Sequence, residues 1–283
     1  MTLQSLANRL TQYDKEEARS IVRLLLECCF NISFTDLCAG ALENMEAEQS
    51  SRLFTLMNRL EQGEPIQYVI GFASFFGNNF IVKPGVLIPR PETEELCEWI
   101  IRDEENDSSP SIKTILDIGT GSGCIAVTLA LRLPSSQVTA WDISNDALAV
   151  ASANADALKA GNVTFAQKDI LKEMVNEESL YDIIVSNPPY ICQKEADEME
   201  QNVLDYEPHT ALFVPDNDPL LFYRHIAEYA AKTLRHRGKL YFEINPFYAE
   251  QIKKMLAEQG FKDITVKEDQ FNKQRMIKAL AAL

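Results

Sequence analysis

The chain has 283 residues, which suits two domains, and its 46% apolar and 24% charged residues are ordinary for a globular protein with a normal core. Its net charge is −15, and residues 91–283 carry 13 of these negative charges, so duplex nucleic acid is not expected as a partner because an acidic surface repels phosphates. The six cysteines include no CxxC pair and there are only three histidines, so we expect reduced thiols and no metal site. We find no signal peptide and no long apolar run, so we expect no membrane span and a cytoplasmic location.

The first seventy residues have the spacing of amphipathic helices. Asp14 is placed to cap a helix whose apolar residues, between positions 18 and 29, share one face. A second helix carries apolar residues at positions 53–60, and Gly63 and Pro65 end it. We therefore predict a helical domain over residues 1–71 and interpret it as a packing or interaction domain that carries no chemistry.

Residues 72–112 have the pattern of a connecting segment. Aromatic and β-branched residues flank Gly77-Asn78-Asn79, and this pattern predicts a β-hairpin. Pro91 with acidic residues behind it suits the first turn of a helix, which we expect to end near Asp103. The polar stretch 104–111 reads as a linker.

From residue 113 onward, short apolar segments alternate with helical stretches. The predicted strands are residues 114–118, 138–141, 163–166, 181–186 and 240–244. The predicted helices are residues 124–133, 145–160, 218–236 and 248–259. Residues 264–268 and 276–280 suit a final antiparallel pair. This alternation is typical of a doubly wound α/β sheet, so we predict one such domain over residues 113–283.

A glycine-rich turn joins the first predicted strand to its helix. The turn consists of Gly119, Thr120, Gly121, Ser122 and Gly123. Asp142 ends the next strand, where a carboxylate can accept hydrogen bonds from both ribose hydroxyls of an adenosine. A dinucleotide pattern would have glycine at Cys124, whereas the early acid Asp117 suits the positive charges of S-adenosylmethionine. After the third strand, Asp169 is placed to bond the adenine amino group and Ile170 to cover the ring.

The fourth strand ends in Asn187-Pro188-Pro189-Tyr190, at the edge of the sheet where ligands sit in open α/β folds. The side-chain oxygen of Asn187 and the carbonyl of Pro188 can each accept one N–H of an NH₂ group. Such a clamp positions a planar, weakly nucleophilic nitrogen against a methyl donor. Pro188 and Pro189 stiffen the loop, and the ring of Tyr190 can stack on a flat group. The motif therefore predicts methyl transfer from S-adenosylmethionine to an amide or amine nitrogen.

Several motifs in order make the chain similar to a known family. They are Pro65–Tyr68, Leu87–Glu94, Asp117–Gly123, Ser186–Ile191, Tyr206–Pro208 and Ala211–Phe213. Together they resemble the PrmC/HemK family, the protein-(glutamine-N5) methyltransferases of peptide-chain release factors. The most specific part is the Ile88-Pro89-Arg90-Pro91-Glu92-Thr93-Glu94 run, because the Asn-Pro-Pro-Tyr motif also occurs in adenine-N6 enzymes.

The resemblance implies a Rossmann-like, seven-stranded class I methyltransferase domain behind a small helical bundle, joined by a β-hairpin. It implies that residues 119–123, Asp142, Ile170 and Asn187 bind S-adenosylmethionine. The glutamine of a Gly-Gly-Gln loop would be held by residues 187–190, with Asn187, Pro188 and Tyr190 catalytic and Arg90 in contact with the substrate. The bundle would grip the release factor, and we expect a monomer without direct nucleic-acid contact. Asn245 stands where the family usually has glycine, and we expect that it can take a left-handed turn.

Three alternatives remain open from the sequence. A glutamine methyltransferase of ribosomal proteins would share the clamp. An adenine-N6 nucleic-acid methyltransferase would share it too, although residues 92–107 and 193–218 each hold eight acids and one base, which is unfavourable for a polyphosphate. A non-catalytic protein that only binds S-adenosylmethionine is disfavoured, because such a protein does not need a nitrogen clamp.

Overall fold

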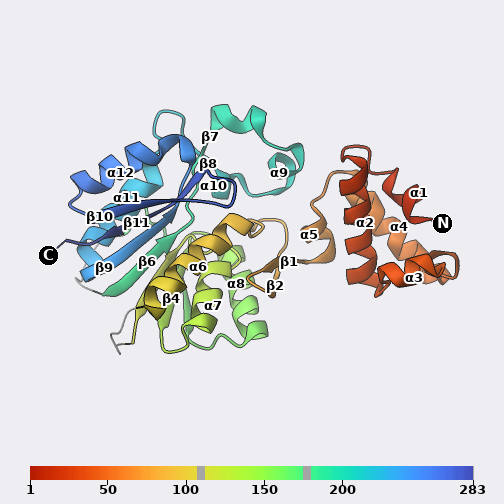
Figure 1. Cartoon of the computed structure of the whole chain (residues 1–283), viewed down its shortest axis with the longest axis horizontal. Helices are drawn as coiled ribbons and strands as arrows, with labels where there is room; N and C mark the ends of the chain where they lie inside the picture. Colours follow the sequence, from red (N-terminus) through yellow and green to blue (C-terminus); the bar gives the residue numbers. More distant parts are fainter. Residues whose placement is uncertain (107–111, 175–179, 283) are drawn as a thin grey trace. The chain divides into compact units, whose positions relative to one another are not determined.

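The computed structural model describes residues 1–106, 112–174 and 180–282, which form two compact units (Figure 1). The first unit contains Met1–Phe72 together with Glu200–Tyr206. The second contains Ala73–Met199 and Glu207–Leu283. The segment around residue 200 therefore leaves the second unit, packs with the first and returns.

The first unit is a bundle of short helices. They are α1 (Leu3–Ala7), α2 (Lys15–Phe30), α3 (Phe34–Cys38), α4 (Ala47–Glu61), α5 (Ile66–Ile70) and α9 (Gln201–Tyr206), with the 3₁₀ turn η1 (Ala41–Glu43). As predicted, Asp14 caps α2 by accepting the amides of Glu16 and Glu17 at 2.8 and 2.9 Å. The apolar faces of α2 and α4 contribute to one buried core, which includes the fully buried Leu25 and Met57.

The second unit is built on a seven-stranded sheet of order β10-β11-β9-β6-β3-β4-β5. The strands are β3 (Thr114–Ile118), β4 (Gln137–Asp142), β5 (Val163–Gln167), β6 (Tyr181–Ser186), β9 (Leu234–Glu243), β10 (Lys262–Glu268) and β11 (Gln274–Leu280). Only the pairs that involve β11 are antiparallel. Because β3 to β6 run parallel, their carboxyl ends meet at one edge of the sheet.

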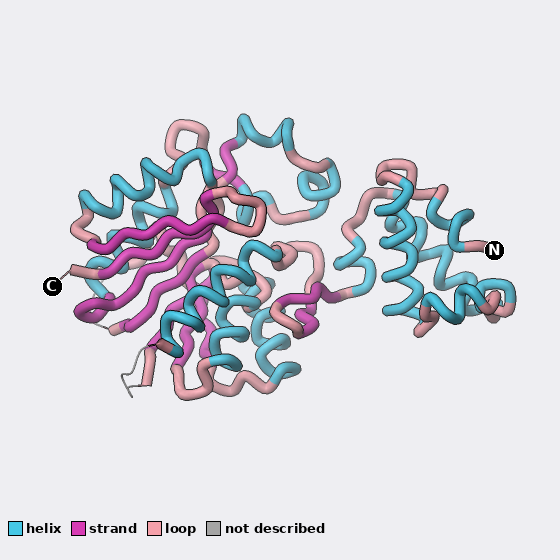
Figure 2. The backbone as a smooth tube through the Cα atoms, viewed as in Figure 1, coloured by secondary structure: helices cyan, strands magenta, loops and turns pink. Residues whose placement is uncertain are grey.

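Helices cover both faces of this sheet (Figure 2). One core joins the sheet to α6 (Pro91–Glu105), α7 (Cys124–Arg132) and α8 (Asn145–Leu158). The core on the opposite face joins it to α11 (Leu221–Thr233) and α12 (Ala249–Glu258). The predicted Rossmann-like fold with seven strands is thus confirmed.

Short elements complete the structure. The hairpin consists of β1 (Phe72–Phe75) and β2 (Asn78–Ile81), and the small parallel pair of β7 (Ile191–Cys192) and β8 (Phe213–Val214). The helical turns are η2 (Gln193–Glu198), α10 (His209–Leu212) and η3 (Pro246–Tyr248). Across the described ranges, no helix has both the length and the apolar character that a membrane crossing requires.

Several predicted boundaries were wrong, among them the start of β9, which lies at Leu234 and not at residue 240. Helix α6 continues through Glu104, which is buried and forms ion pairs with Lys239 at 2.6 Å and Lys113 at 3.4 Å, so the start of the predicted linker is helical. The rest of that linker, residues 107–111, lies outside the described residues. The helix predicted to reach residue 236 ends at Thr233, because Leu234 is buried and already pairs with Tyr181 as part of β9.

Candidate active site

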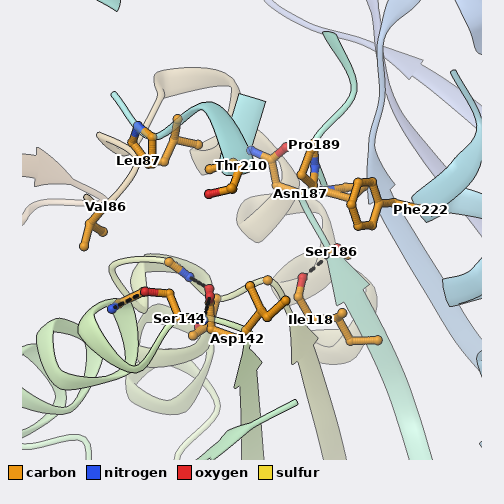
Figure 3. Close-up of a pocket in the computed structure, with 18 of the residues that line it drawn as sticks. Val86, Leu87, Ile118, Asp142, Ser144, Ser186, Asn187, Pro189, Thr210 and Phe222 are labelled. Carbon is orange, nitrogen blue, oxygen red and sulfur yellow. Dashed lines mark hydrogen bonds between the residues drawn. The ribbon is translucent and has the colours of Figure 1, made fainter. Parts of the chain in front are cut away.

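A cavity of about 420 Å³ lies at the carboxyl ends of β3, β4, β5 and β6 (Figure 3). Its walls come entirely from the second unit. Besides the four strand ends, they include residues between 85 and 93, residues between 208 and 213, and two side chains of α11, Phe222 and Ile226. The volume lies within the range of pockets that hold small organic ligands.

The glycine-rich turn is one wall of this cavity. Gly119, Gly121 and Gly123 have φ angles of +74°, +55° and +80°, which residues other than glycine rarely adopt. A Cβ atom at Gly123 would lie 2.9 Å from the Cβ atom of Ala151 on α8. The turn therefore needs glycine both for its backbone path and for its close approach to α8.

Asp142 holds the same turn from β4. Its carboxylate accepts the amide of Gly121 at 2.8 Å and that of Ser144 at 2.9 Å (Figure 3). Burial raises the pKa of Asp142, while these backbone hydrogen bonds act in the opposite direction. Each oxygen keeps a further lone pair, so the carboxylate can still accept from hydroxyl groups of a ligand in the cavity.

Asp169 and Ile170 also line the cavity, after β5. The Asp169 carboxylate accepts the amide of Leu171 at 3.1 Å and pairs with Lys172 at 2.6 Å. The hydrogen bond from Lys172 lowers the pKa of Asp169. Asp169 is thus an ionised group that shapes its loop, and the adenine contact assigned to it stays a prediction.

Asp117 was expected to face the positive charges of S-adenosylmethionine, but it does not line the cavity. It is fully buried, and its Oδ2 atom accepts the Thr120 hydroxyl at 2.6 Å. Burial raises the pKa of Asp117 to about 7. Because Asp117 lies behind the turn and does not line the cavity, it supports the turn instead of forming the wall.

Asn187, Pro188 and Pro189 line the cavity, and Figure 3 shows Asn187 and Pro189 across it from Asp142 and Ser144. The Asn187 Nδ2 atom donates to the Thr93 hydroxyl at 3.2 Å. Just before the motif, the Ser186 hydroxyl donates to the carbonyl of Ile118 at 2.6 Å and ties β6 to β3. These bonds hold the predicted nitrogen clamp against the cavity.

Tyr190 differs from the expectation that its ring is available for stacking. Its hydroxyl donates to the Glu243 Oε1 atom at 3.1 Å, and its ring packs against the core shared with α11 and α12. Tyr190 does not line the cavity. In this structure it supports the clamp from behind, and its contact with a substrate stays a prediction.

Arg90 reaches the cavity from the segment before α6. Its guanidinium forms an ion pair with Glu207, whose side chain is almost completely buried. The other Glu207 oxygen accepts the amide of Ile88 at 3.0 Å. Glu207 thus joins the two segments, residues 85–93 and 208–213, that border the cavity.

Asn245 does not take the expected left-handed turn. Its φ and ψ angles are −71° and 121°, and it caps η3 by accepting the amide of Phe247. Its Nδ2 atom donates to the Tyr190 carbonyl at 3.2 Å and to Glu195 at 3.1 Å. A residue that departs from the family pattern therefore braces the clamp through side-chain bonds.

Sequence reasoning missed several residues of the site. Val86, Leu87, Thr93, Thr210 and Phe222 line the cavity. The apolar run before Pro89 was a usable signal for the first two, because apolar residues beside an irregular turn often cover a ligand. No local pattern marks Phe222, which reaches the cavity from the face of α11.

The buried Asn154 was missed as well. It lies on α8, is fully buried and connects the hairpin to the glycine-rich turn. Its amide nitrogen donates to the carbonyls of Ile81 and Ser122 at 3.0 and 2.9 Å, and its oxygen accepts the Ile81 amide at 2.7 Å. An asparagine on a predicted helix gives no sign of partners so distant in the chain.

The residues present fit S-adenosylmethionine. The glycines allow close approach of the backbone, Asp142 offers acceptors for ribose hydroxyls, and Ile170 offers an apolar wall for a ring. Asp142 also adds negative charge near a ligand that carries positive charge.

Comparison with known proteins agrees with this geometry. Residues 104–206 match the family described as "Methyltransferase small domain" and residues 2–71 match "PrmC N-terminal domain". Among solved structures, a methyltransferase from Pyrococcus furiosus is similar with a TM-score of 0.52 and 16% identity, covering 84% of this chain and all of that one. The human methyltransferase 10 domain containing protein is similar with a TM-score of 0.53 and 20% identity, covering 74% and 90% of the two chains. At these identities, both structures support the fold alone.

Curated relatives are much closer in sequence. The release factor glutamine methyltransferase of Bacteroides thetaiotaomicron is 46% identical over 269 residues, which is 94% of each chain. That of Flavobacterium psychrophilum is also 46% identical and covers 94% and 93% of the two chains. The fold, the cavity and these relatives define an S-adenosylmethionine-dependent methyltransferase. Within that class, the chain belongs to the PrmC/HemK family.

Proposed function

We propose that this chain methylates the side-chain amide nitrogen (N5) of the glutamine in the Gly-Gly-Gln motif of peptide-chain release factors. The observation that carries the proposal is that Asn187 and Pro188, whose oxygens are able to accept hydrogen bonds, line a cavity suited to S-adenosylmethionine. The relatives that cover more than nine-tenths of the chain support the choice of substrate, because they are named as release factor glutamine methyltransferases.

The mechanism follows from the acceptors. When bound, S-adenosylmethionine supplies an electrophilic methyl group on a positively charged sulfur. Asn187 Oδ1 and the Pro188 carbonyl would each accept one N–H of the glutamine amide, which fixes the nitrogen and stabilises the positive charge that it develops. Pro188 is buried and its ring has no N–H to compete for these acceptors. One proton leaves the methylated nitrogen, so the product is a neutral N-methyl amide.

The charge of the chain supports a protein substrate. The acidic segments 92–107 and 193–218 include residues that border the cavity, such as Thr93 and Pro208, and they are unfavourable for a phosphate backbone. They suit a protein with basic residues around its glutamine. Our proposal includes residues 1–71 as the part that contacts the release factor, a monomeric enzyme, no direct contact with nucleic acid and a cytoplasmic reaction.

Transfer of labelled methyl groups from S-adenosylmethionine to candidate substrates tests the proposal. We expect label on intact release factor, with mass spectrometry locating it on the Gly-Gly-Gln glutamine. A release factor in which this glutamine is replaced by glutamate is the matched control and should stay unlabelled. Labelling of ribosomal protein or DNA, with none on release factor, would overturn the proposal in favour of one of the alternatives.

A further inference from the structure

Three polar side chains from three different parts of the fold form a hydrogen-bonded chain behind the clamp. Asn187, after β6, donates from Nδ2 to the Thr93 hydroxyl on α6 at 3.2 Å. The Thr93 hydroxyl in turn donates to the Glu243 Oε2 atom at the end of β9, at 2.6 Å. Thr93 is 2% exposed and Glu243 is 1% exposed, so the chain is shielded from water.

The direction in which each hydrogen bond of this hydrogen-bonded chain points is set by the donor hydrogens that its members carry. A carboxylate only accepts hydrogen bonds, so the single hydroxyl hydrogen of Thr93 must point to Glu243. The oxygen of Thr93 is then left as an acceptor towards Asn187. Only the NH₂ end of the Asn187 amide can satisfy it, so the Oδ1 end is directed away from Thr93.

Glu243 is held as the fixed end of the chain. Tyr190 donates to its second oxygen at 3.1 Å, so both oxygens accept from hydroxyl groups. Burial raises the pKa of Glu243, while the hydrogen bonds from Thr93 and Tyr190 and the positive charge of Arg275 act in the opposite direction. A buried carboxylate with two hydroxyl donors is a costly group to keep for packing alone.

The orientation of the Asn187 amide decides what the clamp can hold. With Oδ1 available, Asn187 accepts an N–H of the substrate amide. With the amide turned over, its NH₂ group would meet the NH₂ group of the substrate, and two donors would face each other. The hydrogen-bond network behind the Asn187 amide therefore determines which of its two ends faces the substrate.

We propose that Thr93 and Glu243 are positioning residues that fix the Asn187 amide with its oxygen towards the substrate nitrogen. This rests on the proposed function, since it assigns a role in the same methyl transfer. Neither residue donates or accepts a proton in the reaction; each acts through the next residue in the chain.

Substitutions at Thr93 separate the hydroxyl from the space that it fills. Thr93→Val keeps the shape and removes the hydroxyl, and we expect kcat on release factor to fall roughly 10- to 100-fold because a slightly misplaced acceptor is costly. The Kd for S-adenosylmethionine and the KM for release factor should change less than threefold. Thr93→Ser restores the hydroxyl and should recover most of kcat. Thr128→Val removes another buried threonine hydroxyl, on α7, whose Oγ1 atom has no partner among the described residues, and it should leave kcat unchanged.

A double-mutant cycle tests whether Glu243 acts through Thr93. Glu243→Gln introduces an amide that can donate to Thr93, so the direction of the chain is no longer enforced and kcat should fall. In the Thr93→Val background the same substitution should add less than a twofold loss, because the connection is already broken. Losses that multiply would show that Glu243 acts independently and would overturn the proposed chain.

A measurement without substrate keeps this inference separate from the proposed function. In protein labelled with ¹⁵N at asparagine, the Asn187 side-chain signals are assigned by their loss in Asn187→Ala. We expect one amide proton to be shifted and protected from exchange in the wild type and in Thr93→Ser, but not in Thr93→Val. Equal signals in wild type and Thr93→Val would overturn the inference, whereas absence of methyl transfer to release factor by the wild type would overturn only the function.

Discussion

At the scale of single residues, Asn187 distinguishes catalysis from cofactor binding. Asn187→Ala removes an acceptor whose hydrogen bond matters mainly in the transition state, so we expect kcat to fall by about 10²–10³ with little change in KM. Asn187→Asp keeps an acceptor but adds a negative charge that stabilises the charged cofactor before transfer, so its rate should fall too. Affinity for S-adenosylmethionine, measured by calorimetry, should stay near that of the wild type for Asn187→Ala. Near-normal turnover by both variants would show that the motif is only a turn.

Asp142 is expected to govern cofactor affinity instead. Asp142→Ala removes the acceptors for the ribose and also releases the Gly121 amide, which the carboxylate now holds at 2.8 Å. Loss of a charged partner costs about 1.5–3 kcal/mol, which corresponds to a Kd weaker by roughly 10- to 150-fold. Asp146→Ala is the matched control, because Asp146 is exposed in the first turn of α8 and does not line the cavity. Equal Kd values for the two variants would contradict the assignment.

Asp117 should make the stability of the cofactor-free protein depend on pH. Burial raises its pKa from 3.8 to about 7, so the folded state keeps a proton that the unfolded state has already lost. The free energy of unfolding should therefore fall as pH rises from about 4 to 7 and stay level above 7. Each pKa unit is worth about 1.4 kcal/mol, so the full effect is on the order of 4 kcal/mol.

Urea unfolding at pH 5 and pH 8 checks this dependence on Asp117. Asp117→Asn cannot ionise but can still accept the Thr120 hydroxyl, so the variant should gain stability relative to the wild type at the higher pH. Asp146→Asn, on the surface, should behave as the wild type at both pH values. A difference between wild type and Asp117→Asn that does not grow with pH would contradict the raised pKa.

At the scale of elements, the hairpin and the glycine-rich turn depend on one side chain. Asn154→Ala removes the bonds that α8 makes with Ile81 and Ser122 and leaves their buried backbone groups without these partners. We expect a loss of stability on the order of 2–3 kcal/mol and weaker cofactor binding, since the turn loses its support. Ser152→Ala, on the exposed side of the same helix, is the control. Equal denaturation midpoints for the two variants would contradict the role of Asn154.

The elements also show what could be predicted from sequence. Strands β3, β4 and β6 were predictable because buried parallel strands are short apolar runs. Asp142 is the last residue of β4, while Gly119 and Asn187 directly follow β3 and β6. The hydrogen bonds that support these strand ends could not be predicted, since the partners of Asn154, Thr93 and Glu207 are tens of residues away along the chain. Tyr190 illustrates the limit, because its motif predicts a ring at the substrate while its hydroxyl is bonded to a buried carboxylate on another strand.

At the scale of the whole molecule, the chain passes between its two units more than once. The first unit contains Glu200–Tyr206 in addition to the N-terminal helices, and the Tyr206 hydroxyl donates to the carbonyl of Gln62 at 2.9 Å. The next residue, Glu207, belongs to the second unit and forms an ion pair with Arg90, which lines the cavity. The chain thus passes between the two units at three peptide bonds, Phe72–Ala73, Met199–Glu200 and Tyr206–Glu207, and the last of these leads into the segment beside the cavity.

This arrangement leads to a prediction for a fragment that starts at Phe72. Every residue that lines the cavity belongs to the second unit, so the fragment should bind S-adenosylmethionine with nearly the affinity of the full chain. It should methylate a short Gly-Gly-Gln peptide at a comparable rate, because the clamp is intact. On intact release factor we expect kcat/KM to fall at least tenfold, since the helices assigned to binding that protein are missing, and α9 loses the Gln62 carbonyl as a partner. The peptide serves as the control for folding, because a fragment inactive on both substrates would point to a damaged site. Equal kcat/KM values for the fragment and the full chain on intact release factor would show that the helical unit does not grip the substrate.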